Sequence, residues 1–330
     1  MKNKLKKSKC LKKEIMVSIP NRIHMFVFDF RLLKDIKKRA GGLGLAVETD
    51  NQMIIRISDN MVIKSQHALV LDYFCGELRK LLLYEGKFEV IVKQDIDVHA
   101  GYGSTISLIS SLCYGINQMF GQPFTIDYLR RFILERYCEE EEGKLIKAFD
   151  TGIGALCSFY GGMNYMEMDF SHLHINIPKK YCLLSFVPQN KLHQETLTVK
   201  NEYERFEYTK KQEKIDEKEK RDVISKNLIP HMFERDLYGI GKDLRKIHQL
   251  GSKKVECSFY GYDFQIELID DVLEHGGCIA GLSSAGPVNY ILIEKKYVES
   301  MISNLRKYCA KEDIKKMRIS ETGIKEYYYA

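Results

Sequence analysis

The chain has 330 residues, of which 45% are hydrophobic and 11% aromatic, so it can fill one large core or two moderate ones. This composition excludes disorder as the main state. The formal net charge of +6 arises in the first 13 residues, which hold seven lysines and no acid, while the rest carries 44 basic and 45 acidic residues. A near-neutral body lacks the broad basic surface that duplex binding needs, so we expect no nucleic-acid partner.

Other global features exclude a membrane protein. The chain has no run of about 18 apolar residues, so we expect no membrane partner. Charges interrupt the N-terminus until Met16, which argues against a secretory signal. The nine cysteines are scattered singly, without CxxC or zinc-finger spacing, as is typical of a reducing compartment. We therefore predict a cytoplasmic protein whose residues 1–15 form a basic, disordered tail.

The hydrophobic pattern predicts alternating strands and helices in the first part of the chain. Partial alternation of β-branched and aromatic residues predicts strands in three segments, 16–32, 52–64 and 87–98. Helical spacing marks residues 66–84 and the segment after Gly103, and Thr125 is the expected N-cap of a further helix. The run of four glutamates at 139–142 is predicted to be a solvated loop.

The later part of the chain has a different pattern. Residues 200–225 are dense in alternating charge, which indicates an exposed helix or linker between two halves. Beyond them we expect two strands and two helices, at 255–268, 290–298, 227–250 and 295–310. The fold class is therefore α+β, with domains at 16–190 and 191–330.

Three glycine-rich segments are candidate anion sites. The first, residues 97–105 (DVHAGYGST), places a glycine turn between a strand end and a helix start, where free N–H groups and the helix dipole favour phosphate. It is neither a P-loop nor a dinucleotide fingerprint. The second is FDTGIGALCSFYGG at 149–162, and the third is GGCIAGLSSAGPV at 276–288. One such turn is often a plain connection, but three favour a polyphosphorylated ligand held from several sides.

These segments resemble, in order, motifs of the GHMP superfamily of small-molecule kinases, and more closely of its β-ribofuranosylaminobenzene 5′-phosphate synthase branch. The matching stretches are IPNRIH with Asp29, RAGGLGLA at 39–46, HAGYGS at 99–104, GIG followed by GG at 152–162, and GLSSAGP at 281–287. The resemblance implies a two-domain GHMP kinase-like fold. Its N-terminal half would be ribosomal protein S5 domain 2-like, and its C-terminal half a ferredoxin-like α+β unit.

The resemblance also implies a reaction. Many GHMP kinases have an S-G-x-D segment whose aspartate lies beside the reacting hydroxyl, whereas this chain has Thr151-Gly-Ile-Gly154. Glycine cannot act as a base. The synthase branch instead implies a decarboxylating C-ribosyltransferase, a pentosyltransferase of the methanopterin or C-nucleoside type. It would join phosphoribosyl pyrophosphate to an aromatic or heteroaromatic carboxylic acid, with loss of CO2 and pyrophosphate and with Mg²⁺ as cofactor.

That chemistry suggests site residues, because charge develops on the leaving pyrophosphate and must be neutralised. The candidate for holding a carboxylate or phosphate is Arg22, whose planar fork gives two parallel hydrogen bonds. His24 or His99 would orient the acceptor or handle a proton, and Asp29 is either catalytic or only paired with Arg22. The candidate phosphate- and substrate-binding residues are Gly101, Gly103, Ser104, Thr105, Thr151, Gly152, Gly154, Ser283, Ser284 and Gly286. Metal ligands are left unassigned.

Departures from the branch leave the acceptor open. Thr105-Ile-Ser107 follows Gly103-Ser104, and the acidic stretch at 138–150 replaces a short link before TGIG. The acceptor is thus an aminobenzoate, a hydroxybenzoate or a heterocyclic acid. Two other classes remain: an ATP-dependent GHMP kinase that uses another carboxylate, such as Asp150, and a catalytically silent ligand-binding member. The acidic segment at 139–142 is also a candidate homodimer surface.

Overall fold

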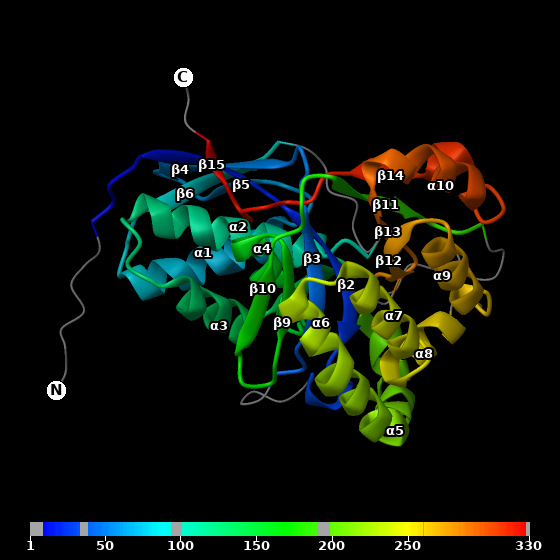
Figure 1. The fold of residues 1–330 in the computed structure, drawn as a ribbon. Helices are drawn as coiled ribbons and strands as arrows, with labels where there is room; N and C mark the ends of the chain where they lie inside the picture. The colour runs from blue at the N-terminus through cyan, green and yellow to red at the C-terminus, as the bar shows by residue number, and fades with distance from the viewer. Residues whose placement is uncertain are drawn as a thin grey trace.

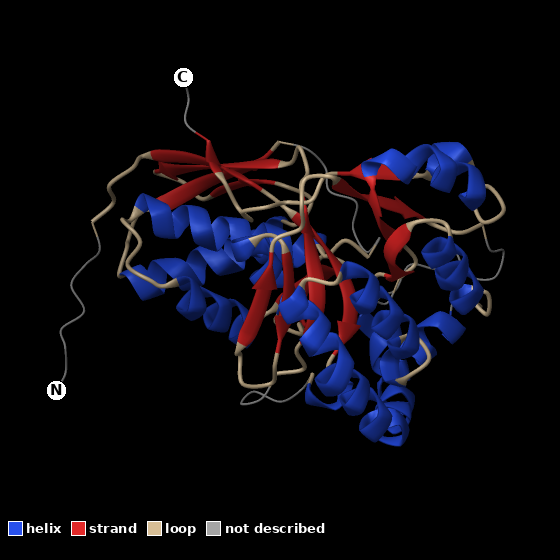
Figure 2. Cartoon of the chain, viewed as in Figure 1, coloured by secondary structure: helices blue, strands red, loops and turns tan. Residues whose placement is uncertain are grey.

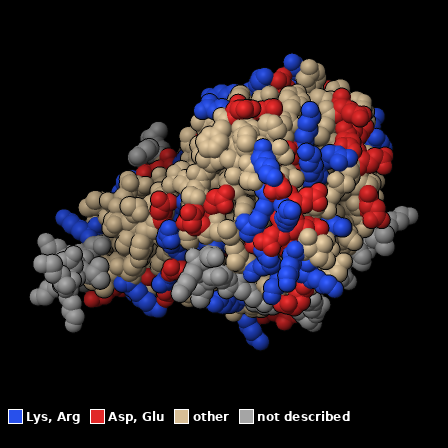
Figure 3. All heavy atoms as spheres, turned by 60° about the horizontal axis from the view of Figure 1, so that its bottom comes forward, with Lys and Arg blue, Asp and Glu red and all other residues tan. Residues whose placement is uncertain are grey.

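The computed structural model describes residues 9–33, 39–93, 101–189, 199–259, 261–284 and 286–327, with side chains of the fourth range described from residue 205. Three larger sheets and the helices between them form its layers, and a two-stranded hairpin adds a fourth, small sheet (Figures 1 and 2). Among the described helices, none has both the length and the apolar character that crossing a bilayer needs. On the face seen in Figure 3, basic and acidic side chains are interspersed.

The first sheet has five strands in the order β15-β1-β4-β6-β5. Its strands are β1 (Glu14–Ser18), β4 (Gln52–Ser58), β5 (Val62–Lys64), β6 (Lys87–Val92) and β15 (Glu326–Tyr327). One face packs on α1 (Ala68–Leu82) and α2 (Ser104–Met119), and α3 (Ile126–Arg136) lies below them (Figure 1). Alternation along β1 sends Ile15 and Val17 into the same apolar cluster as Phe74 and Leu112, so the helices are held by this core.

The second sheet carries the residues that matter most for function. Its order is β10-β9-β3-β2, with β2 (Asn21–Val27), β3 (Gly42–Val47), β9 (Met163–Met166) and β10 (His172–Ile175). All seven residues of β2 are buried, polar ones included, because layers cover the strand on both faces. Helix α4 (Ile153–Tyr160) covers one side of the sheet, packing Leu156 and Cys157 against Ala46 and Met166.

The third sheet has the order β12-β13-β11-β14. Its strands are β11 (Tyr181–Phe186), β12 (Gly277–Leu282), β13 (Asn289–Glu294) and β14 (Lys315–Met317), and its outer helices are α9 (Gln265–Glu274) and α10 (Val298–Leu305). Four further helices precede α9 in the chain: α5 (Val199–Val223), α6 (Ile229–Glu234), α7 (Leu237–Ile247) and α8 (Gly251–Phe259). One apolar cluster joins Ile23, Leu45, Ile240 and Leu292, so the second and third sheets share a core.

The α+β class is confirmed, and several predicted elements are observed. Helix α1 lies within the predicted 66–84 segment. Thr125 caps α3, because its Oγ1 accepts a hydrogen bond from the Tyr128 N–H at 3.2 Å. The strand predicted at 87–98 is observed as β6, and residues 94–98 lie outside the described part of the chain.

Three local predictions were wrong. The glutamate run is not a loop, because β7 (Cys138–Glu141) pairs with β8 (Lys144–Lys147) in a hairpin. The stretch predicted as a strand at 255–268 instead contains the end of α8, at 255–259, and the start of α9, at 265–268. Short apolar runs often fit both the helix and the strand period. Residues 200–225 are helical but are not merely exposed, because the side chains of Phe206, Thr209, Glu213 and Lys220 are buried.

Strand pairing crosses the predicted domain boundary near residue 190 in both directions. Strand β11 precedes it yet pairs with β13 and β14. Strand β15 ends the described chain yet pairs with β1 of the first sheet. The predicted tail is likewise shorter than expected, because Leu11 N donates to Met119 O at 2.8 Å and β1 begins at Glu14. Residues 1–8 lie outside the described residues.

Candidate active site

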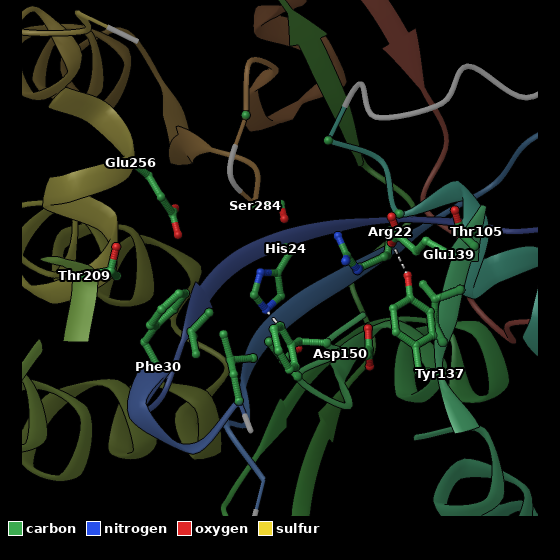
Figure 4. Close-up of a pocket in the computed structure, with 18 of the residues that line it drawn as sticks. Arg22, His24, Phe30, Thr105, Tyr137, Glu139, Asp150, Thr209, Glu256 and Ser284 are labelled. Atoms are coloured by element: carbon green, nitrogen blue, oxygen red, sulfur yellow. Dashed lines mark hydrogen bonds between the residues drawn. The ribbon is translucent and has the colours of Figure 1, made fainter. Parts of the chain in front are cut away.

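A pocket opens between β2, the start of α2 and helices α5 and α8 (Figure 4). It brings together most of the site residues predicted from the sequence. Those that line it are Arg22, His24, Gly101, Gly103, Ser104, Thr105, Thr151, Ser284 and Gly286. All three glycine-rich segments therefore contribute residues to one site, as the expected ligand requires.

The start of α2 forms one wall of this pocket. Gly103 is the N-cap and has φ 64° and ψ 44°, a left-handed conformation that glycine adopts without steric cost. Within the part of the chain that the structure describes, no side chain caps this helix. The first N–H groups of a helix have no partner within it, and here they belong to Ser104 and Thr105, whose residues line the pocket. An anion is the natural partner for such a helix start.

Arg22 adds a second cationic group at the same place. Its backbone N–H donates to Tyr102 O at 2.9 Å, which ties β2 to the glycine turn. A Cβ at Gly103 would lie 2.8 Å from Arg22 Cζ, so the guanidinium lies directly against the turn. Arg22 is 9% exposed, and its Nε and Nη1 have no hydrogen-bond partner among the described residues. Buried N–H groups without a hydrogen-bond acceptor are costly, and an anionic ligand would supply one.

Two carboxylates lie at this end of the pocket. Asp150 Oδ1 accepts from Gly152 N at 2.7 Å, and Glu139 Oε1 accepts from the Tyr137 hydroxyl at 2.5 Å. Burial raises the pKa of Asp150, and the charge of Arg22 opposes that shift. Each carboxylate uses one oxygen in these bonds, so the other remains able to accept a further hydrogen bond or a cation.

His24 lies between this end and the opposite one in Figure 4. Its Nε2 is 3.3 Å from Thr151 Oγ1. Burial, followed by the charges of Arg22, Lys253 and Lys220, holds the pKa of His24 well below 6.5. The imidazole is therefore neutral at neutral pH, with one ring nitrogen as donor and the other as acceptor.

The opposite end of the pocket is formed by α5, α8 and the short 3₁₀ turn Phe30–Leu32. The ring of Phe206 lies 5.2 Å from that of Phe30 and 5.9 Å from that of Phe149, measured between centroids, and all three line the pocket. Glu256 of α8 also lines it, and burial raises the pKa of its carboxyl. Aromatic side chains at such spacing form an apolar wall suited to a flat ring.

Asp29 is not among the residues that line the pocket. Its Oδ2 accepts from Arg31 Nη2 at 2.8 Å and from Arg221 Nη2 at 3.4 Å. The prediction that Asp29 pairs with Arg22 was wrong, because its partners are Arg31 and Arg221. The pairing instead links the turn that carries Phe30 to α5. His99 lies outside the described residues.

Three other predicted site residues, Gly152, Gly154 and Ser283, do not line the pocket but pack or bond against neighbouring elements. A Cβ at Gly152 would lie 2.3 Å from Met166 Cε, and one at Gly154 would lie 2.5 Å from Ile106 Cγ2. Ser283 is fully buried; its hydroxyl donates to Gly101 O at 2.7 Å and accepts from His24 N at 3.2 Å. These residues hold the pocket's elements together.

Sequence reasoning missed most of the aromatic end of the pocket and some residues of the α2 end. The missed lining residues are Val27, Phe30, Leu33, Ile106, Tyr137, Glu139, Phe149, Arg205, Phe206, Thr209, Val255 and Glu256. Residues 205–209 lie in the charged stretch that looked like a linker, and no motif marks them. The one usable signal was Phe206, an aromatic residue within an otherwise polar run.

No family model matches the chain, but two proteins of known name are similar to it over most of its length. It is 25% identical over 314 residues to β-ribofuranosylphenol 5′-phosphate synthase of Archaeoglobus fulgidus, covering 89% of this chain and 92% of that protein. It is 26% identical over 310 residues to the same-named protein of Methanocaldococcus jannaschii, covering 86% and 91%. These matches confirm the predicted resemblance to the synthase branch.

Solved structures agree on the fold. Homoserine kinase from Cytophaga hutchinsonii has a TM-score of 0.62 at 14% identity and covers 97% of this chain and 99% of its own. Mevalonate diphosphate decarboxylase from Staphylococcus aureus has a TM-score of 0.64 at 14% identity and covers 95% and 98%. The chain has the GHMP fold.

Proposed function

We propose that this chain is a decarboxylating C-ribosyltransferase that joins phosphoribosyl pyrophosphate to an aromatic carboxylic acid. One observation carries the proposal: a single pocket has polar groups at one end and three aromatic rings at the other. The polar end has a helix start that no described side chain caps and buried Arg22, whose Nε and Nη1 have no described hydrogen-bond partner. The relatives named β-ribofuranosylphenol 5′-phosphate synthase support the same activity.

In this proposal the α2 end binds the pyrophosphate of the donor. The N–H groups of Ser104 and Thr105 and the fork of Arg22 donate to phosphate oxygens. These donors are fixed before the reaction, so they stabilise the charge that develops as the leaving group departs. The pocket also holds donor and acceptor in one orientation, which removes most of the entropic cost of bringing them together.

Mg²⁺ is part of the proposal. No group of three His, Cys, Asp or Glu side chains suited to a metal occurs among the described residues. Mg²⁺ often binds through one or two carboxylates together with substrate phosphates, and Asp150 and Glu139 are the carboxylates that line the α2 end. The ion would neutralise part of the negative charge that develops on the leaving pyrophosphate.

The bond changes explain why no base is needed at the ring carbon. The bond between C1′ and the pyrophosphate oxygen breaks, and C1′ bonds to the ring carbon that bears the carboxylate. The bond to that carboxylate then breaks, CO2 leaves, and its electron pair restores the aromatic ring. No proton is removed from a hydroxyl, which agrees with Gly154 where many GHMP kinases have aspartate. Neutral His24, between the two ends, would orient the reacting groups by hydrogen bonding.

A GHMP kinase is the second candidate, because one carboxylate favours it. Asp150 lines the pocket beside the proposed phosphate site, and burial raises its pKa toward that of a usable base. The named sequence relatives favour the synthase. We further predict a cytoplasmic location, which the nine free thiols support, and a homodimer remains a prediction.

The direct test supplies Mg²⁺, phosphoribosyl pyrophosphate and a carboxyl-labelled acid. 4-Hydroxybenzoate, 4-aminobenzoate and a heterocyclic acid would be compared. We expect labelled CO2 and pyrophosphate in equal amounts with one class of acid. Phosphorylated product from ATP, with no CO2 from any acid, would refute the synthase and support the kinase.

A further inference from the structure

The aromatic end of the pocket contains polar groups that the proposed donor site does not use. In Figure 4, Glu256, Thr209 and Phe30 lie on one side of His24, and Arg22, Thr105 and Glu139 lie on the other. All of them line the same pocket. A molecule held by the α2 end therefore leaves Glu256 and Thr209 facing a second molecule.

Buried Lys253 holds the carboxylate of Glu256 in place. Lys253 is 1% exposed, and its Nζ donates to Leu282 O and Ser284 O, both at 2.8 Å. The same Nζ lies 2.7 Å from Glu256 Oε2, and the Glu256 side chain is 12% exposed. The carboxylate is thus anchored on one oxygen, while its residue still borders the pocket.

The neighbouring polar group has the same hydrogen-bonding character. Thr209 Oγ1 donates to Arg205 O at 3.0 Å, so only acceptor capacity is left on that hydroxyl. Arg205 also lines this end of the pocket and lies over the Phe259 ring, with its Cζ 3.4 Å from the ring centroid. Glu256 and Thr209 both present oxygens that accept, so the ligand group that fits them is a donor.

We propose that Glu256 is the residue that selects the acceptor, by accepting a hydrogen bond from a hydroxyl or amino group opposite the acceptor's carboxylate. This inference rests on the proposed function. The carboxylate-bearing carbon must face the donor, near His24, so the group that reaches Glu256 is on the far side of the ring. The rings of Phe30 and Phe206 border the space between.

The interaction would also assist the reaction. Hydrogen bonding to Glu256 increases electron donation from the oxygen or nitrogen into the ring, and this raises electron density at the opposite carbon, where the bond to C1′ forms. The shared proton stays on the hydroxyl or amine when CO2 has left, so no further reactant is consumed. Acids without such a group would bind weakly and react slowly.

The test compares Glu256→Gln with Glu274→Gln, a matched change on an exposed residue of α9. Titration calorimetry would measure dissociation constants for 4-hydroxybenzoate and for 4-methoxybenzoate, which cannot donate. Loss of a hydrogen bond to a charged group predicts roughly 10-fold weaker binding of the hydroxy acid by Glu256→Gln. Binding of the methoxy acid should stay within about two-fold, and Glu274→Gln should match the unmodified chain.

The outcomes separate this inference from the proposed function. Equal discrimination between the two acids in Glu256→Gln and the unmodified chain would overturn the inference, even if CO2 is released. Lost discrimination without CO2 release from any acid would support the acceptor subsite and refute the reaction. If Glu256→Gln does not fold, as circular dichroism would show, Thr209→Val tests the same site. It should weaken the hydroxy acid selectively, and unchanged selectivity would contradict the inference.

Discussion

Helices α2 and α4 begin in the same way but have different roles. Gly103 and Gly152 are their N-caps, with φ of 64° and 92°, and neither glycine supplies a side-chain cap. The start of α2 faces the pocket beside Arg22. The start of α4 is satisfied internally, because Gly152 N donates to Asp150 Oδ1 at 2.7 Å and Ile153 N to Thr151 Oγ1 at 3.3 Å. A glycine before a helix therefore indicates an anion site only when no side chain occupies its N–H groups.

The largest effect is expected from Gly103→Val. A β-branched residue is strained at φ 64°, and its side chain would displace the guanidinium of Arg22. We expect donor binding to be abolished and the free energy of unfolding to fall by at least about 1–2 kcal/mol. Calorimetry with phosphoribosyl pyrophosphate and Mg²⁺ measures the first, and denaturant unfolding the second. Donor affinity equal to that of the unmodified chain would show that the phosphates bind elsewhere.

Arg22→Gln separates binding from stability. It removes a guanidinium whose Nε and Nη1 have no described hydrogen-bond partner, so we expect donor affinity to fall by roughly 100-fold. The thermal midpoint should change little, because the charge of Arg22 also favours the charged form of buried Asp150. Melting curves with and without the donor measure both effects. Reduced stability with unchanged donor affinity would instead assign Arg22 a structural role.

Gly154→Ala examines the α4 side of the comparison. The added Cβ would lie 2.5 Å from Ile106 Cγ2, so α2 and α4 must separate or Ile106 must move. Overpacking of this kind costs about 1–3 kcal/mol of unfolding free energy. Because Ile106 lines the pocket next to Thr105, we expect the donor affinity of the folded protein to fall slightly, and by far less than in Arg22→Gln. A loss of affinity as large as that of Arg22→Gln would erase the distinction between the two helix starts.

The smallest effect concerns pH and the third glycine-rich segment. His248 accepts from Leu282 N at 3.0 Å and donates to Leu244 O at 2.8 Å, and burial lowers its pKa to about 3. Below pH 6.5 the unfolded chain takes up a proton that folded His248 refuses, so stability falls as pH falls. The slope is at most about 1.4 kcal/mol per pH unit from this residue. His248→Gln should flatten the stability profile between pH 6 and 5; an unchanged profile would contradict this.

The sequence predicted the parts of the site that chain-local patterns specify. A glycine turn before an apolar helix is visible in one short segment, so Gly103 and Ser104 could be predicted as site residues. Arg22 could be predicted from the ability of its guanidinium to bind an anion. The aromatic wall was not visible, because Phe30, Phe149 and Phe206 are distant in sequence and meet only through tertiary packing.

The fold was predictable to a similar extent. Helix α1 and the cap of α3 follow from periodicity and a local hydrogen bond. The return of β15 to β1 and the pairing of β11 with β13 are contacts between distant segments, which no local pattern encodes. The α8 segment has too few residues for its apolar spacing to distinguish a helix from a strand.

The central claim is that the α2 end of the pocket binds a phosphoribosyl donor. The most direct measurement is a thermal-shift titration with Mg²⁺ and either phosphoribosyl pyrophosphate or ATP, because a ligand that binds only the folded state raises the midpoint with concentration. We predict a concentration-dependent rise with phosphoribosyl pyrophosphate that Arg22→Gln removes. A rise with ATP alone would contradict the account.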